Sequence, residues 1–213
     1  MQNQRDGGIH RWWRRCRLEK SVDGGMPFSA VYIGDIDGER VRACESRLRR
    51  LNAPVVAFSG DATATVKSVV RRLNSHGLHV GFLDPYNLQT LDFEMVKALA
   101  TLHHVDILMH ISQMDLQRNL DQYSSGDSKV FDTFIPGWRD AISASSMKAT
   151  RQAVLRYWGE LVGSLGVWPS SEARLIKGAG NQPLYWLMLA AKNELALAFW
   201  KVATNKQRQG TLF

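Results

Sequence analysis

Short apolar runs alternate with helix-period segments through the first half of this chain, and no other feature constrains its fold as strongly. We predict strands near residues 30–35, 54–59, 78–83 and 105–111. The segments between them repeat apolar residues every three or four positions, as amphipathic helices do. Continuous apolar strands separated by such helices are typical of a parallel sheet that is covered on both faces. Since crossovers between parallel strands are right-handed, the predicted fold class is α/β, with a doubly wound, mainly parallel sheet.

The pattern changes in the second half of the chain. It loosens after Ser112, and we interpret residues 112–147 as a long insertion. Residues 173–177 and 183–191 are predicted to form a C-terminal antiparallel hairpin, with a glycine-rich turn between them. A last helix over 194–204 is predicted to place three apolar residues inward, namely Leu195, Phe199 and Val202.

The balance of charge and the cysteine content narrow the classes of function. The net charge of +7 favours contact with a polyanion such as nucleic acid. Much of the excess lies in two groups of arginines: Arg11, Arg14, Arg15 and Arg17, and Arg40, Arg42, Arg47, Arg49 and Arg50. No apolar run approaches the ~20 residues of a membrane span, and two scattered cysteines indicate neither a disulfide framework nor a zinc site. We therefore expect a cytoplasmic protein with no membrane contact.

The N-terminal segment differs from the rest of the chain. We expect residues 1–26 to be a basic arm, disordered or preceding the native start, and residues 27–213 to form one domain. Residues 9–17 mix cations with aromatics, which suits either single-stranded nucleic acid binding or a plain disordered arm. Histidines 103, 104 and 110 lack further well-spaced ligands, so we predict no metal site and interpret them as solvated or core residues.

Three successive predicted strands each end in an acid, namely Asp35, Asp61 and Asp84. Ligands bind outside the carboxyl ends of the strands of an open parallel sheet, so we expect the three to gather at one edge. There a carboxylate can accept hydrogen bonds from ribose hydroxyls or from an adenine amine. The alternative is an aspartate that is solvated or caps a helix, because strand-to-helix turns favour this residue.

A sharper signal is the tripeptide Asp84-Pro85-Tyr86, which follows the predicted strand 78–83. It resembles the Asn/Asp-Pro-Pro-Tyr motif of amino-group methyltransferases. In that motif the first side chain and the next carbonyl hold the target nitrogen, while the aromatic stacks on the planar target. Proline stiffens the turn and removes a backbone donor. The alternative is an ordinary turn, since Asp-Pro-x-Asn is also good turn chemistry.

Taken with other short pieces, this motif resembles one family, the three-Cys-motif partner proteins. The pieces are Tyr32 to Arg40, Gly60 to Ala62, Phe82 to Tyr86, Gln117 to Leu120, and the ending from Pro183-Leu184-Tyr185 through Phe199-Trp200. The resemblance implies a class I S-adenosylmethionine (SAM) methyltransferase-like fold of the Rossmann-like type, and a three-Cys-motif, radical-SAM-like protein as partner. It assigns Asp84, Pro85 and Tyr86 to the target amine. It assigns cofactor contacts to Asp35, Asp37, Asp61 and Ala62, with Asp35 at the ribose and Asp61 and Ala62 at the adenine.

The chain departs from this family in its cofactor loop. Members usually open with a strand and a Phe-Ala-Gly-x-Gly loop, but residues 1–26 contain no such loop, and no G-x-G-x-x-G precedes a helix. Only glycine lets the backbone approach the cofactor so closely, so we expect SAM to bind weakly or not at all. Two functions follow. The first is a methyltransferase acting on an amino group, for which nucleic acid is one candidate target. The second is a non-catalytic binding module that pairs with a protein or nucleic acid.

Overall fold

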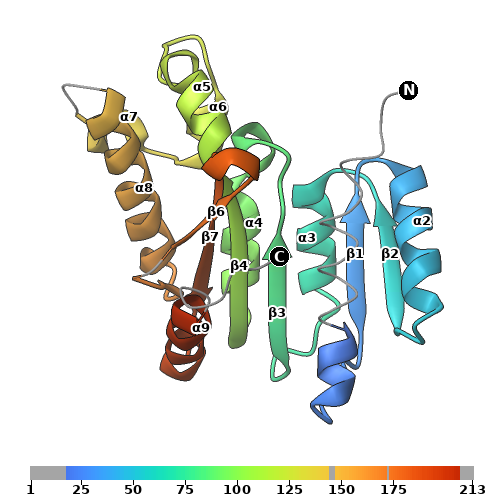
Figure 1. Ribbon diagram of the computed structural model, residues 1–213. Helices are drawn as coiled ribbons and strands as arrows, with labels where there is room; N and C mark the ends of the chain where they lie inside the picture. Colours follow the sequence, from blue (N-terminus) through green and yellow to red (C-terminus); the bar gives the residue numbers. More distant parts are fainter. Residues whose placement is uncertain (1–17, 144–146, 172, 207–213) are drawn as a thin grey trace. The chain divides into compact units, whose positions relative to one another are not determined.

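A computed structural model of the chain describes residues 18–143, 147–171 and 173–206 (Figure 1). It is a mixed α/β structure in which two compact units are distinguished, Met1–Thr65 and Val66–Phe213. The single domain expected over 27–213 thus divides into two units, and the strands form two sheets, not one. None of the helices in the described ranges is long and apolar enough to cross a membrane.

The first unit is built on a parallel pair of strands, β1 (Val31–Asp35) and β2 (Val55–Ser59). Helix α2 (Gly38–Arg49) connects them as the predicted crossover. It begins where Asp37 accepts hydrogen bonds from the backbone N–H groups of Glu39 and Arg40, which satisfies donors that the first turn leaves open. Both strands and the helix were therefore predictable from the apolar runs and their spacing.

A small core holds the first unit together. It consists of Leu18, Ile33, Leu48, Ala53 and Val55, with Val31, Cys44, Leu51 and Ala57 packed against it. Leu18 belongs to a helical turn over residues 18–23. This end of the predicted N-terminal arm is therefore ordered and contributes to the core, while the basic and aromatic stretch over 9–17 lies outside the described residues.

The sheet of the second unit is mixed. Strands β3 (Leu78–Leu83) and β4 (His104–Ser112) are parallel, and β7 (Pro183–Ala191) is antiparallel to β4. The short strands β5 (Trp168–Pro169) and β6 (Arg174–Lys177) both pair with β7 in antiparallel orientation. The predicted C-terminal hairpin is confirmed as β6 and β7, joined through a single 3-10 turn, η2 (Ala179–Asn181).

One face of this sheet carries the main hydrophobic core. Seven helices of the described ranges follow β2 in the chain, and they lie on both sides of the sheet. They are α3 (Ala62–Val70), which starts in the first unit, α4 (Phe93–Ala100), α5 (Gln113–Tyr123), α6 (Val130–Phe134), α7 (Trp138–Ala141), α8 (Met147–Ser164) and α9 (Glu194–Lys206). The segment predicted as an insertion, 112–147, contains α5, α6 and α7. It supplies fully buried side chains such as Phe131 and Phe134, whose rings lie next to each other, and the ring of Phe134 also stacks on Trp158 of α8. This segment is therefore part of the core and not a surface loop.

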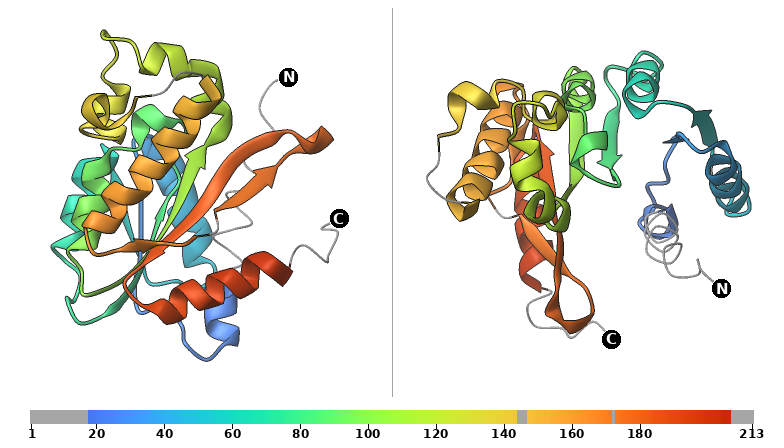
Figure 2. Two further views of the ribbon diagram at one scale, coloured as in Figure 1. Left: turned by 90° about the vertical axis from the view of Figure 1, so that its left-hand side faces the viewer. Right: turned by 90° about the horizontal axis from the view of Figure 1, so that it is seen from above.

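Helix α9 lies on the side of the sheet away from α8 (Figure 2). The residue range predicted for this helix was correct, but the face predicted to point inward was wrong, because Leu195, Phe199 and Val202 are all exposed. The helix carries a second apolar stripe, with Leu197 and Trp200, and this stripe is half-buried. Helical periodicity alone cannot choose between two such stripes.

The two phenylalanines Phe131 and Phe199 provide a test of these assignments. Phe131→Ala should lower the free energy of unfolding by about 3–5 kcal/mol, because it leaves a cavity in the core. Phe199→Ala should change it by less than about 0.5 kcal/mol, because Phe199 is 65% exposed. Urea unfolding followed by circular dichroism measures both. Equal losses would mean that the exposed face of α9 is covered in the folded protein.

Candidate functional site

Three neighbouring strands of the second unit place Asp84, His110 and Tyr185 together. The parallel register pairs Leu83 of β3 with Met109 of β4, so Asp84 and His110 are the next residues along each strand. Side chains alternate between the faces of a sheet, so His110 points away from the main core, to which Met109 belongs. Strand β7 is antiparallel to β4 on the side opposite β3, and its Tyr185 pairs with Ser112. The ring of Tyr185 lies against the ring of His110.

The contacts within this group are close. His110 Nδ1 lies 2.7 Å from Asp84 Oδ1, and the two side chains are 18% and 16% exposed. The rings of His110 and Tyr185 are 3.9 Å apart between centroids. Burial, and secondly the charge of Asp84, raise the pKa of Tyr185, so its phenol stays protonated at neutral pH. A carboxylate accepts only, so Nδ1 of His110 donates to it, which fixes the orientation of the ring.

The turn after Asp84 exposes one aromatic side chain and anchors the residues that follow it. Tyr86 is 93% exposed. Asn87 then forms a capping box with Thr90 over the 3-10 turn η1 (Leu88–Thr90). Leu88 is fully buried, and its backbone N–H donates to Asp115 Oδ2 at 2.9 Å. The turn is thus held at both ends, with Tyr86 projecting from its middle.

Asp115 is the centre of the network that holds this turn. Its carboxylate also accepts from Asn119 Nδ2 at 2.7 Å and from the Tyr123 hydroxyl at 3.0 Å. Its own N–H donates to the hydroxyl of Ser112, which caps α5. Burial, and then the hydrogen bond and charge of Asp115, raise the pKa of Tyr123 to about 12. The hydroxyl therefore remains a donor across the physiological range.

Asp35 and Asp61 lie at one edge of the first unit, as predicted. The pair Asp35 and Ser59 ends the register of β1 and β2, and the N–H of Gly60 donates to the carbonyl of Asp35 at 3.0 Å. Gly60 has a φ of 143°, a conformation that favours glycine, and it turns the chain from β2 toward α3. Asp61 follows, and Ala62 is the first residue of α3.

Two of the acids predicted to bind the cofactor cap helices. Asp61 Oδ1 accepts from the N–H of Ala64 at 2.8 Å, at the start of α3. Asp37 caps α2, and its other oxygen is 3.2 Å from Arg40 Nε. Asp35 Oδ1 accepts from the N–H of Asp37 at 2.9 Å. The helix-capping alternative therefore holds for Asp37 and Asp61, while Asp35 lies half-buried at the strand end.

The two units hold different parts of the predicted site. Asp35, Asp37, Asp61 and Ala62 belong to the first, and the turn that begins at Asp84 belongs to the second. The gathering of all three strand-end acids at one edge therefore stays a prediction for Asp84. Sequence reasoning did not find His110 and Tyr185. Aligning the apolar ends of the strands 78–83 and 105–111 would have placed His110 beside Asp84, whereas no signal pointed to Tyr185.

The arrangement consists of a carboxylate, an imidazole and two tyrosine rings. In the described ranges, no three His, Cys, Asp or Glu side chains are grouped as a metal ion would require. Comparisons of the chain with models of protein families, with curated proteins and with solved structures found no match. The groups present for chemistry at this site are the carboxylate of Asp84, which His110 holds in place, and the exposed ring of Tyr86 in the same turn.

The network of Asp115 generates a spectroscopic prediction. The raised pKa of Tyr123 favours the protonated phenol in the folded state, so its contribution to stability is complete below about pH 10. That contribution is lost as the pH rises through about 12. An absorbance titration of tyrosinate should show one phenol that ionises last, and Tyr123→Phe should remove it. Tyr86→Phe is the control and should leave the last component in place; loss of that component in the control variant would contradict the assignment.

Proposed function

We propose that this protein is a class I SAM methyltransferase-like protein of the three-Cys-motif partner type, whose turn Asp84-Pro85-Tyr86 binds an amino group on a planar target. The observation that carries the proposal is the pairing of Asp84 with His110 beside an almost fully exposed Tyr86. An ordinary solvated turn needs no buried histidine behind its first residue. The resemblance of the turn to the amino-group methyltransferase motif supports the same function.

Each residue of the turn has a distinct task in this proposal. Asp84 accepts a hydrogen bond from the target amine, and His110 keeps its carboxylate from rotating. Positioning of this kind can account for a large part of a reduced barrier. Pro85 stiffens the backbone and leaves its carbonyl as a second acceptor. Tyr86 offers a ring on which a base can stack, which is worth ~1–3 kcal/mol.

The residues at hand fit the cofactor only in part. Asp35 lies where the resemblance places the ribose, but Asp37 and Asp61 already use oxygens to cap helices. The described strands β1, β2 and β3 are followed by single glycines or none, so no glycine-rich cradle for the methionine part of SAM is formed.

This poor fit favours a second candidate function. A methyltransferase-like fold that keeps its target-binding turn but lacks a cofactor cradle suits a non-catalytic binding module. Its partner would be the three-Cys-motif protein that the family resemblance implies, or nucleic acid. Both functions use the same turn, so they differ in SAM binding and in turnover, not in the residues that contact the target.

Calorimetry with SAM separates the two functions. Two or three neutral hydrogen bonds contribute about 0.5–1.5 kcal/mol each, and ordering a ligand costs several kcal/mol. We expect weak or undetectable binding, with a Kd well above the micromolar range. Micromolar binding that Asp35→Ala abolishes would contradict this expectation and favour the enzyme.

Substitutions in the turn test the proposed target site. Tyr86→Ala should weaken binding of single nucleosides and short oligonucleotides by about 10- to 100-fold, because it removes a stacking surface, while Tyr86→Phe should retain binding. Asp84→Ala should abolish discrimination between a base with an exocyclic amine and one without it, and any transfer from labelled SAM to nucleic acid or to the partner protein. Asp121→Ala removes an exposed acid of α5 and is the control. If Asp84→Ala behaves like this control, the turn is an ordinary turn.

A further inference from the structure

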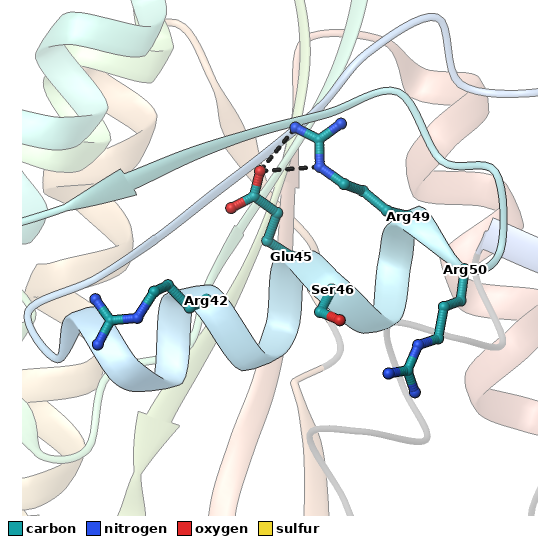
Figure 3. A pocket seen from close by; sticks show the side chains of 5 residues that line it. All are labelled: Arg42, Glu45, Ser46, Arg49 and Arg50. Atoms are coloured by element: carbon teal, nitrogen blue, oxygen red, sulfur yellow. Dashed lines mark hydrogen bonds and ion pairs between the residues drawn. The ribbon is translucent and has the colours of Figure 1, made fainter.

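Helix α2 of the first unit presents an unusual density of arginines to solvent. Arg42, Ser46, Arg49 and Arg50 follow one another at spacings of four, three and one, so they share one side of the helix. Arg47 flanks them, and all five side chains are exposed. We call these five residues the arginine face. With Glu45, four of them line a shallow depression of about 500 Å³ (Figure 3).

The opposite side of α2 is fixed to the protein. Val41 and Leu48 are buried, and Cys44 packs against the core of the first unit. The helix therefore cannot roll to hide its arginines. No large apolar side chain lies among the arginine face, so it lacks the aromatic or aliphatic anchor that protein interfaces and membrane-binding helices use.

Charge pairing accounts for only one member of the arginine face. Arg49 forms an ion pair with Glu45 at 2.7 Å. Within the described ranges, no carboxylate lies within 4.0 Å of Arg42, Arg47 or Arg50. Figure 3 shows the guanidinium groups of Arg42 and Arg50 extending away from the Glu45–Arg49 pair. Three cations are thus available to an external anion.

Stabilisation of the helix does not explain the whole pattern. Cations near a helix C-terminus interact favourably with the helix dipole, which covers Arg47, Arg49 and Arg50. Arg42 lies in the N-terminal half, where the same dipole offers a cation nothing. A further explanation is therefore needed for Arg42 and for the use of arginine throughout, since lysine would serve equally well for solubility.

We propose that the arginine face of α2 binds the phosphate backbone of nucleic acid. Guanidinium groups bind phosphate oxygens through two parallel hydrogen bonds, and the hydroxyl of Ser46 adds a donor at the centre. Arg42 and Arg50 are eight residues apart, which separates them by about 12 Å along the helix, so they reach different phosphates and not a single one. Contacts of this kind select no sequence. The proposal does not depend on the target site at Asp84.

The test is the salt dependence of oligonucleotide binding. Fluorescence anisotropy with a labelled oligothymidylate, and with a duplex of the same length, gives Kd between 50 and 200 mM salt. The triple variant R42Q/R47Q/R50Q should weaken binding of the single strand by about 10- to 100-fold at 100 mM salt. The slope of log K against log salt should become shallower by about 2, since each lost phosphate contact removes about 0.7.

A charge-matched control separates a binding face from general attraction. R71Q/R118Q/R156Q removes three exposed arginines of the second unit and the same total charge, and it should change Kd less than threefold. R42K/R47K/R50K should keep most of the salt slope, which shows that the fold is intact. Equal losses in both glutamine triples, no binding by the unaltered protein, or equally tight binding of polyglutamate would each overturn the proposal.

Discussion

Strand β4 is hydrogen-bonded on both sides, and the second unit depends on this constraint. Its parallel partner β3 and its antiparallel partner β7 fix which face each side chain takes. Val105, Ile107, Met109 and Ile111 are thereby directed into the main core, and all are buried. The intervening positions face the other side, where His110 meets Asp84. A shift of register by one residue would exchange the two sets, so the same pairing that builds the core also assembles the site.

The carboxylate of Asp115 links the end of β4 to the turn after β3. It accepts from the backbone of Leu88, from Asn119 and from Tyr123, so a half-buried charge is compensated by three donors. Since unpaired buried charges are costly, removal of one donor would weaken the others as well. Helix α5, which lies in the segment interpreted from the sequence as an insertion, therefore supports the turn that begins at Asp84.

Much of the fold was predictable because its strands are continuous apolar runs. The predicted strands differ from β1, β2, β3 and β4 by one residue at most at each end. The buried face of a helix was less predictable. Helix α9 carries two apolar stripes, and tertiary packing decides that the stripe with Trp200 faces the protein. The division into two units and the contact between His110 and Tyr185 depend on pairings between distant segments, which helical or strand periodicity does not encode.

The turn from Asp84 to Leu88 combines an exposed residue with a residue on which folding depends. Leu88 contributes its whole side chain and its amide to the stability of the second unit, whereas Tyr86 contributes almost none of its surface. Substitutions of an exposed residue usually change stability by less than about 0.5 kcal/mol. Natural drift can therefore exchange the residue at position 86 freely while the scaffold stays unaltered. A substitution at this position therefore needs no compensating change elsewhere in the chain.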